Sequence, residues 1–201
     1  MRSHFVRFAL GPALLLAAGV AGAVVSGAPA PGFTITDTAG KAVQLADYKG
    51  KYVVLEWTNP ECPFVRSHYS SGSMQGLQKE WGGRNVVWLT INSTNASHSE
   101  FKAPREMASW MQAQGAAPAA TLLDSTSGTG RAYSAKTTPH MFVVDPGGKV
   151  VYAGAIDDKR STNPADAKSA HNYVRAALTE ATSGKPVTVA NTTPYGCTIK
   201  Y

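Results

Sequence analysis

The sequence predicts an α/β fold in which helices flank a central mixed β-sheet, with a β-hairpin added before it and an extended tail after it. Short apolar, β-rich segments alternate with helical periodicities, which is typical of parallel strands joined by helices. Two later strands flank the turn Asp-Pro-Gly-Gly at 145–148, which indicates an antiparallel hairpin. The 201 residues, 43% of them hydrophobic, suffice for one domain and are too few for two ordinary ones.

Residues 1–23 have the layout of a secretory signal peptide. Arg2 and Arg7 precede an apolar run at 8–20, and small residues at 21–23 form a cleavage site. The apolar character continues to Val25, so an uncleaved anchor is the alternative, but small residues dominate its second half and favour cleavage. No other segment approaches the ~20 apolar residues of a membrane span. We therefore expect an exported, periplasmic protein with no stable membrane span after cleavage.

Composition divides the remaining chain into three parts. A linker rich in Pro, Ala and Gly occupies residues 24–32, the main domain 33–184, and a C-terminal tail 185–201. The formal net charge of +6 comes from basic residues scattered along the chain, without a run of Lys and Arg interleaved with aromatic residues. No nucleic-acid partner is therefore expected.

Apolar periodicity and capping residues predict the elements of the main domain in order. Asn163 and Pro164 start a last helix whose apolar stripe continues to Ala181 and which Gly184 ends. Proline at the first helical position likewise predicts a helix that begins at Pro63 and is kinked or interrupted at 70–73. The remaining expected elements are a hairpin of strands at 33–35 and 42–45, strands at 51–57, 85–91, 121–124, 140–144 and 149–152, and helices at 104–114 and 129–134.

Cys62 lies between the expected buried strand at 51–57 and the helix that begins at Pro63. Reactive groups in open α/β sheets gather where a strand ends and the next helix begins. Unpaired N–H groups and the positive end of the helix dipole both favour a thiolate there. A purely structural half-cystine has no need of this position, so we interpret Cys62 as a solvent-reachable redox nucleophile. Arg66, one turn on, either adds positive charge near the sulfur or is a solvated helix side chain.

A second signal is the Thr138–Pro139 pair ahead of the apolar strand at 140–144. Proline cannot donate to a β-ladder, so it must lie at the start of the strand or at an edge. A cis bond before Pro139 would suit a close approach of the backbone to the sulfur. A trans proline that opens the strand is the alternative.

Together these motifs resemble the thioredoxin-fold redoxins. The segments EWTNPECPFV (56–65), TPHMFVVD (138–145) and GKVVYAG (148–154) look like the peroxiredoxin-like branch of the alkyl hydroperoxide reductase/thiol-specific antioxidant (AhpC/TSA) family. The tail at 194–201 is similar to the ending of exported members. The resemblance covers about residues 30–201 and implies a thioredoxin fold, with Cys62 at the reactive position and Pro139 as the facing cis-proline.

The chain departs from the patterns of this family at three positions. Val65 replaces the second cysteine of the thioredoxin CxxC motif, so there is no adjacent dithiol. Leu55 and Asn59 stand where the peroxiredoxin motif PxxxTxxC has proline and threonine. The side-chain amide of Asn59 can still donate a hydrogen bond to a peroxide oxygen.

Cys197 is the only internal partner for an oxidised Cys62, because the chain has two cysteines. About 13 residues separate it from Gly184, and at ~3.3 Å per residue an extended tail spans about 40 Å, enough to cross the domain. We predict that Cys62 attacks a peroxide or a disulfide and that Cys197 resolves the product. A permanent disulfide that staples the tail is the alternative.

The favoured function is a periplasmic peroxiredoxin-like thiol oxidoreductase that acts on a peroxide or protein disulfide and takes electrons from an unidentified thiol donor. Thiol–disulfide exchange with exported clients is the second hypothesis, and a non-catalytic binding module with a structural Cys62–Cys197 disulfide is the third. No cofactor and no metal are expected, because the histidines lack ligand spacing with the cysteines. The predicted site comprises catalytic Cys62 and Cys197, supported by Asn59, Pro63, Arg66, Thr138 and Pro139.

Overall fold

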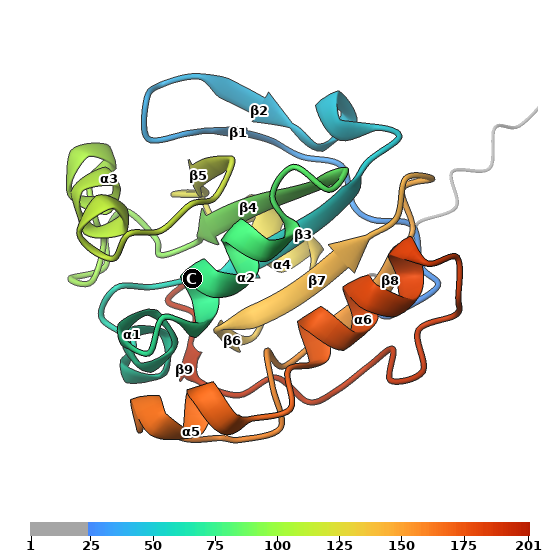
Figure 1. Ribbon diagram of the computed structural model, residues 1–201. Helices are drawn as coiled ribbons and strands as arrows, with labels where there is room; N and C mark the ends of the chain where they lie inside the picture. Colours follow the sequence, from blue (N-terminus) through green and yellow to red (C-terminus); the bar gives the residue numbers. More distant parts are fainter. Residues whose placement is uncertain (1–23) are drawn as a thin grey trace, which may run out of the picture.

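A five-stranded mixed sheet forms the centre of the protein, whose computed structural model describes residues 24–201. The strand order is β5-β4-β3-β7-β8 (Figure 1), in which β3, β4 and β5 are parallel and β7 runs antiparallel to both β3 and β8. The predicted signal peptide at 1–23 lies outside the described residues. The strands are β3 Tyr52–Trp57, β4 Val86–Asn92, β5 Ala120–Leu123, β7 His140–Val144 and β8 Val150–Gly154.

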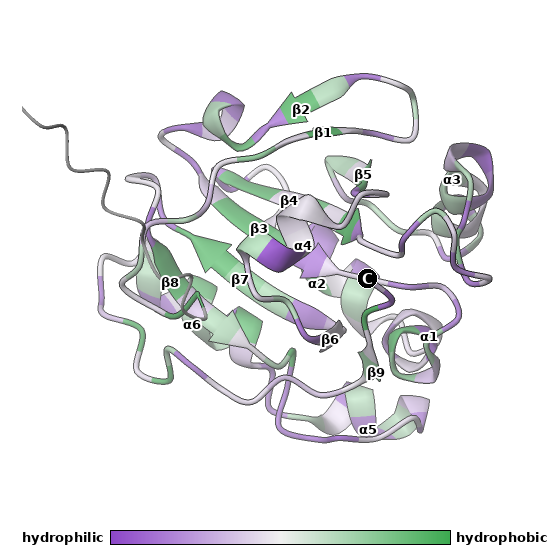
Figure 2. Ribbon diagram, turned by 180° about the vertical axis from the view of Figure 1, so that it is seen from behind, coloured by the Kyte–Doolittle hydropathy of each residue, from purple (hydrophilic) through white to green (hydrophobic). Residues whose placement is uncertain are grey.

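Two apolar clusters lie on opposite faces of this sheet, as the alternation of side chains along a strand requires. Val54 and Val143 belong to the cluster under helices α1, α2, α3 and α6, whereas Leu55 and Phe142 belong to the cluster under the N-terminal hairpin and α4. Figure 2 shows the hydrophobic colour concentrated on the central strands. The helices are α1 Pro63–Ser70, α2 Ser73–Trp81, α3 Pro104–Ala113, α4 Gly128–Ala132 and α6 Tyr173–Thr182.

The N-terminal hairpin consists of β1 Thr34–Thr36 and β2 Ala42–Gln44, which pair antiparallel as predicted. Asp37 forms the turn, since its side chain accepts hydrogen bonds from the backbone N–H groups of Ala39 and Lys41. A 3₁₀ helix, η1 Leu45–Tyr48, follows and leads into β3. The hairpin closes the face of the sheet opposite α1 and α2.

The predicted interruption near residues 70–73 is present between α1 and α2. Gly72 has a φ of +79°, a left-handed conformation that glycine adopts at little steric cost, and the chain turns there before α2 begins. Local sequence therefore determined this break.

The prediction of one continuous helix after Asn163 is wrong. Two helices, α5 Pro164–Ser169 and α6, are separated by extended backbone at Ala170. Asp158 causes the break: its backbone N–H donates to the carbonyl oxygen of His171 over 3.2 Å, and its carboxylate accepts from the N–H of His171 over 2.9 Å. Asn172 then caps α6 by accepting the N–H of Arg175. Contacts with a distant loop thus override the helical periodicity.

The tail after Gly184 is extended, as predicted, and returns along the sheet edge. Its backbone bonds to β8, where Ala153 donates to Ala190 O over 3.0 Å. Near its end the tail forms the short strand β9 Cys197–Thr198, which pairs antiparallel with β6 Thr137–Thr138. The C-terminus therefore lies close to α1 (Figure 1).

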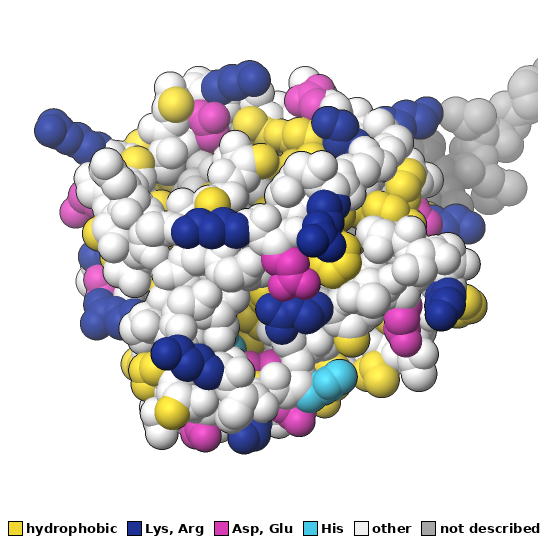
Figure 3. All heavy atoms as spheres, in the orientation of Figure 1, with side chains coloured by type: hydrophobic (Ala, Val, Ile, Leu, Met, Phe, Trp, Pro, Cys, Tyr) yellow, Lys and Arg dark blue, Asp and Glu magenta, His cyan; other side chains and the backbone are white. Residues whose placement is uncertain are grey.

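Lys and Arg side chains are spread over the face in Figure 3, with acidic side chains between them, so this face presents no single basic patch. Within residues 24–201, no helix has the length and apolar character needed to cross a membrane.

Candidate active site

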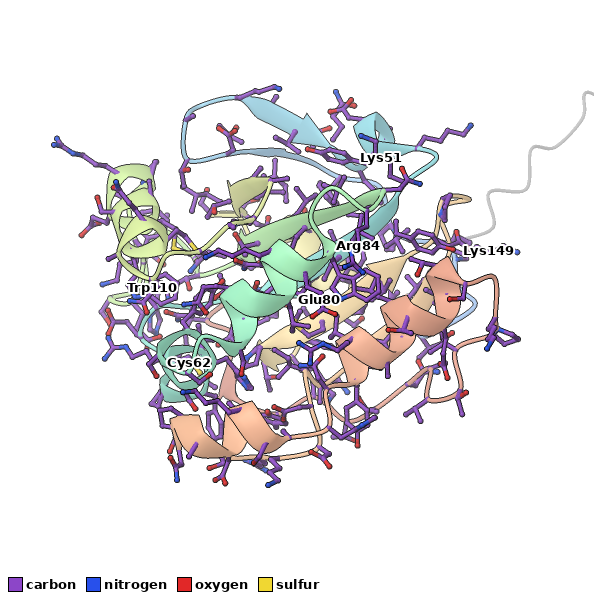
Figure 4. All side chains as sticks on the ribbon, viewed as in Figure 1. Lys51, Cys62, Glu80, Arg84, Trp110 and Lys149 are labelled. Carbon is purple, nitrogen blue, oxygen red and sulfur yellow. The ribbon has the colours of Figure 1, made fainter. Side chains whose placement is uncertain are left out.

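Cys62 is the residue that precedes the first turn of α1. Its backbone is extended (φ −79°, ψ 119°), its carbonyl oxygen accepts the first helical bond from Arg66 N, and Pro63 follows at the first helical position. The missing N–H of Pro63 costs nothing there because the first N–H groups of a helix have no helical partner. Figure 4 shows Cys62 at this end of α1. The sulfur is therefore held where a strand gives way to a helix.

The Thr138–Pro139 segment lies against this sulfur. The peptide bond between the two residues is cis. The Sγ of Cys62 donates to the carbonyl oxygen of Thr138 over 3.0 Å, and Thr138 is buried. The N-cap residue of α1 and the short strand β6, Thr137–Thr138, thus meet through one side chain and one backbone carbonyl, although 76 positions separate the two residues.

Cys197 reaches the same place from the tail. It is paired with Thr138 in the β6–β9 ladder, and both cysteines are free thiols. Gly196 makes this approach possible: its φ is +135°, and a Cβ atom there would lie 1.9 Å from the carbonyl oxygen of Thr138. Only glycine permits that contact without displacing the backbone.

The two thiols interact. Burial is the main cause that raises the pKa of Cys197 to about 12, and a hydrogen bond with the Cys62 thiol adds to it. Cys197 therefore stays protonated at neutral pH, and a protonated thiol is a poor nucleophile.

The expectation that solvent reaches Cys62 is wrong in this conformation. Its exposed fraction is 1%, and it packs in the same apolar cluster as Tyr195, with Cys197 against that cluster. The tail occupies the space beside the sulfur that a strand–helix junction would otherwise open to solvent.

Asn59 and Arg66 brace the loop before Cys62 rather than the sulfur itself. The amide of Asn59 donates to Glu100 Oε2 over 2.8 Å, and its oxygen accepts the backbone N–H of Glu61. Arg66 donates to the carbonyl oxygen of Pro60 and forms an ion pair with Glu61 at 2.9 Å. The side chain of Arg66 is 57% exposed.

Glu61, next to Cys62 in sequence, is held at the surface. Its carboxylate lies 2.7 Å from Lys102 Nζ and 2.9 Å from Arg66 Nη2. The hydrogen bond from Lys102 lowers the pKa of Glu61, so it remains ionised. Two cations compensate its negative charge.

Sequence analysis missed a buried carboxyl group in β3 that is hydrogen-bonded to α1 through Tyr69. Glu56 in β3 is fully buried and accepts hydrogen bonds from Tyr69 Oη (2.8 Å), Trp88 Nε1 (2.8 Å) and Gln78 Nε2 (3.2 Å). Burial raises its pKa to about 7 despite these donors. The sequence feature that could have indicated this group is a glutamate inside an otherwise apolar strand.

A model of the AhpC/TSA family matches residues 26–153, well over half of the chain. The chain belongs to the AhpC/TSA family. The match includes Cys62 and Pro139 and ends before the tail that carries Cys197. The resemblance found in the motifs is thereby confirmed, and the protein is a thiol-dependent oxidoreductase.

Similar proteins support the same assignment of family and fold. The thiol-disulfide oxidoreductase ResA of Bacillus subtilis (strain 168) is 27% identical over 168 residues, 80% of each chain. The crystal structure of an uncharacterized conserved protein from Geobacillus kaustophilus is similar with a TM-score of 0.77 and 30% identity, covering 88% of this chain and 92% of that one. The thioredoxin domain of a thiol-disulfide oxidoreductase from Bacteroides vulgatus gives a TM-score of 0.53 at 22% identity, covering 65% and 89%. The expected thioredoxin fold is confirmed.

Proposed function

We propose that this family member is an exported thiol–disulfide oxidoreductase in which Cys62 attacks a protein disulfide and Cys197 resolves the mixed disulfide. One observation carries the proposal: Thr138, whose carbonyl accepts the Cys62 thiol, is paired directly with Cys197. The similarity to a protein named thiol-disulfide oxidoreductase supports the same reaction class.

The reaction follows from thiol–disulfide chemistry. The Cys62 thiolate attacks one sulfur of the client disulfide, the client S–S bond breaks, and one client thiolate leaves and takes up a proton. Cys197 then loses its proton and attacks the Sγ of Cys62, which releases the second client thiol and forms a Cys62–Cys197 disulfide. The client gains two electrons, and a thiol donor later returns two electrons to the protein.

The raised pKa of Cys197 suits the second position in this order. A thiol that stays protonated is a poor nucleophile toward the client, which suits Cys197 to the resolving step. In the mixed disulfide, Cys62 is no longer a thiol, and its contribution to the raised pKa of Cys197 is removed.

Peroxide reduction is the second candidate, and the family assignment favours it. There the Cys62 thiolate attacks a peroxide oxygen, the O–O bond breaks, and water or an alcohol leaves. Cys197 would condense with the resulting sulfenic acid, which forms the Cys62–Cys197 disulfide and releases water. We place this below disulfide exchange because Asn59, the expected donor to the peroxide, already donates to Glu100.

The cellular setting belongs to the same proposal. A leader at residues 1–23 would direct export, which leaves a linker at 24–32, the redoxin domain at 33–184 and the tail at 185–201. Outside the cytosol, the client would be a disulfide-bonded protein, and a thiol donor would be needed to complete the cycle.

The test compares the protein with its Cys62→Ser and Cys197→Ser variants, using insulin as the disulfide probe and hydrogen peroxide as the peroxide probe. Insulin should oxidise the protein to a Cys62–Cys197 disulfide, visible by mass spectrometry after alkylation. Cys197→Ser should accumulate a mixed disulfide with insulin, and Cys62→Ser should be inert. Faster consumption of peroxide than of insulin disulfide would favour the second candidate, and a bridge that resists reduction would favour a structural role.

A further inference from the structure

Three buried polar side chains hold the tail two residues before Cys197. The hydroxyl of Tyr195 donates to Asp157 Oδ1 over 2.5 Å and lies 3.1 Å from His68 Nε2. His68 and Asp157 are 1% and 2% exposed, and Tyr195 is 8% exposed. We call Tyr195, Asp157 and His68 the tail latch. Its members come from the tail, from the loop after β8 and from α1.

The direction of the hydrogen bonds in the tail latch follows from the chemistry of its members. Because the Tyr195 hydroxyl gives its hydrogen to Asp157, the His68 ring must donate to that hydroxyl through Nε2–H. Burial lowers the pKa of His68 to about 4, so the ring is neutral at physiological pH. The backbone N–H of Lys159 also donates to Asp157 Oδ1, which fixes the carboxylate.

The latch joins the tail to the helix that starts at Cys62. His68 lies in the last turn of α1, and the Phe64 ring, one turn earlier, packs edge-on against Tyr195 with centroids 5.7 Å apart. From Tyr195 the chain passes through Gly196 and reaches Cys197. His68, which binds Tyr195, and the reactive Cys62 therefore belong to the same helix, α1, and its N-cap.

The other side of β9 is attached to a different segment. Ile199 N donates to the carbonyl oxygen of Lys136, and the Tyr201 hydroxyl donates to the carbonyl oxygen of Ala135. Cys197 thus lies between two attachments, of which only Tyr195 is tied to α1. Thr192 still binds β8 upstream, so loss of the latch would remove the attachment nearest to Cys197 on that side, together with its link to α1.

We propose that Tyr195 is a positioning residue that holds the tail closed over Cys62, so that the latch speeds resolution by Cys197 and slows access of external reagents to Cys62. The inference rests on the proposed function, because it takes Cys197 as the resolving thiol. A thiol held in place acts at a far higher effective concentration than one on a flexible arm, which reaches only the millimolar range.

Tyr195→Phe tests the latch because it removes one hydroxyl and keeps the ring that packs on Phe64. After oxidation with one equivalent of oxidised glutathione, closure of the Cys62–Cys197 disulfide should slow about tenfold. In a Cys197→Ser background, where Cys62 is the only cysteine, the same change should raise the rate of Cys62 alkylation by iodoacetamide several-fold. Asp157→Asn retains an acceptor oxygen and should show a smaller effect on both rates.

Tyr52→Phe is the matched control. This change also removes a tyrosine hydroxyl that donates a partly buried hydrogen bond, here to the backbone carbonyl of Ala181 at 2.7 Å. Tyr52 lies outside the tail and the site. Both rates should match those of the parent protein, and circular dichroism melting curves will show that each variant is folded.

The role of the latch would be overturned if the folded Tyr195→Phe variant closed the disulfide and was alkylated at the rates of the parent protein. Equal changes of both rates in the Tyr52→Phe variant would overturn it too. Failure of the proposed function gives a different result, since the parent protein would then form no Cys62–Cys197 disulfide. The alkylation measurement still tests the latch in that case, because it needs no resolving step.

Discussion

The thiol of Cys62 donates to the backbone carbonyl oxygen of Thr138 over 3.0 Å. The same residue is the β-ladder partner of Cys197. One short stretch of backbone ahead of a cis-proline therefore lies between a helix start and a tail strand, and it brings together two sulfurs that are 135 positions apart in sequence.

Replacing Gly196 with alanine should displace the tail strand. The added Cβ would lie 1.9 Å from Thr138 O in a backbone conformation that L-residues rarely adopt. We expect the β6–β9 pairing to be lost, with faster hydrogen exchange at residues 197–199 and alkylation of Cys62 at least several-fold faster. Exchange and alkylation rates equal to those of the parent protein would contradict this account.

Gly76→Ala is the control for that substitution. Gly76 lies within α2, and nothing lies within 4 Å of an added Cβ. Alanine there should raise the free energy of unfolding by about 0.5–1 kcal/mol, because it restricts the unfolded chain and favours the helix. The alkylation rate of Cys62 should not change.

Glu56→Gln should stabilise the protein at alkaline pH. Burial raises the pKa of Glu56 from 4.5 to about 7, so the native state retains a proton that the unfolded state has lost. The free energy of unfolding therefore falls as pH rises from 4.5 to 7, by an amount on the order of 3 kcal/mol. Urea denaturation should show the Glu56→Gln variant to be more stable than the parent at pH 8, with the difference shrinking by pH 5. A difference independent of pH would point to another cause.

His140 should contribute to acid denaturation. Burial, with a smaller contribution from Lys136, lowers its pKa from 6.5 to about 3. Between these values the unfolded state binds a proton that the native state excludes, so stability falls with falling pH by about 1.4 kcal/mol per unit. His140→Asn keeps an acceptor for the N–H of Lys136, which now donates to Nδ1. Denaturation curves at pH 6, 5 and 4 should show a weaker pH dependence for this variant, and parallel curves would refute the assignment.

Asn172→Ala should loosen the start of α6. Its side chain accepts the N–H of Arg175 over 2.8 Å, and loss of such a cap costs about 1 kcal/mol. Asn163→Ala removes the corresponding cap of α5, a helix without buried residues, and should cost less. Thermal melts should show a decrease of about 2–4 °C for Asn172→Ala. A larger decrease for Asn163→Ala would contradict the assignment of α6 as the better-packed helix.

Local patterns were enough to predict most elements. The apolar run of β3, Pro63 at the helix start and the break before α2 all depend on residues close in sequence, and the structure agrees with each. The last helix was predicted wrongly because its break depends on Asp158, whose hydrogen bonds with His171 no helical periodicity can reveal.

The sequence by itself determined that Cys62 stands before Pro63 at a helix start and that the tail is long enough to reach it. Only the tertiary structure decided that the tail does reach it, that Cys62 is buried there, and that Tyr195 is anchored between Asp157 and His68. The reason is physical: helix starts and chain reach follow from neighbouring residues. The burial of Cys62 and its proximity to Cys197 depend on which segments, far apart in sequence, pack against each other and exclude water.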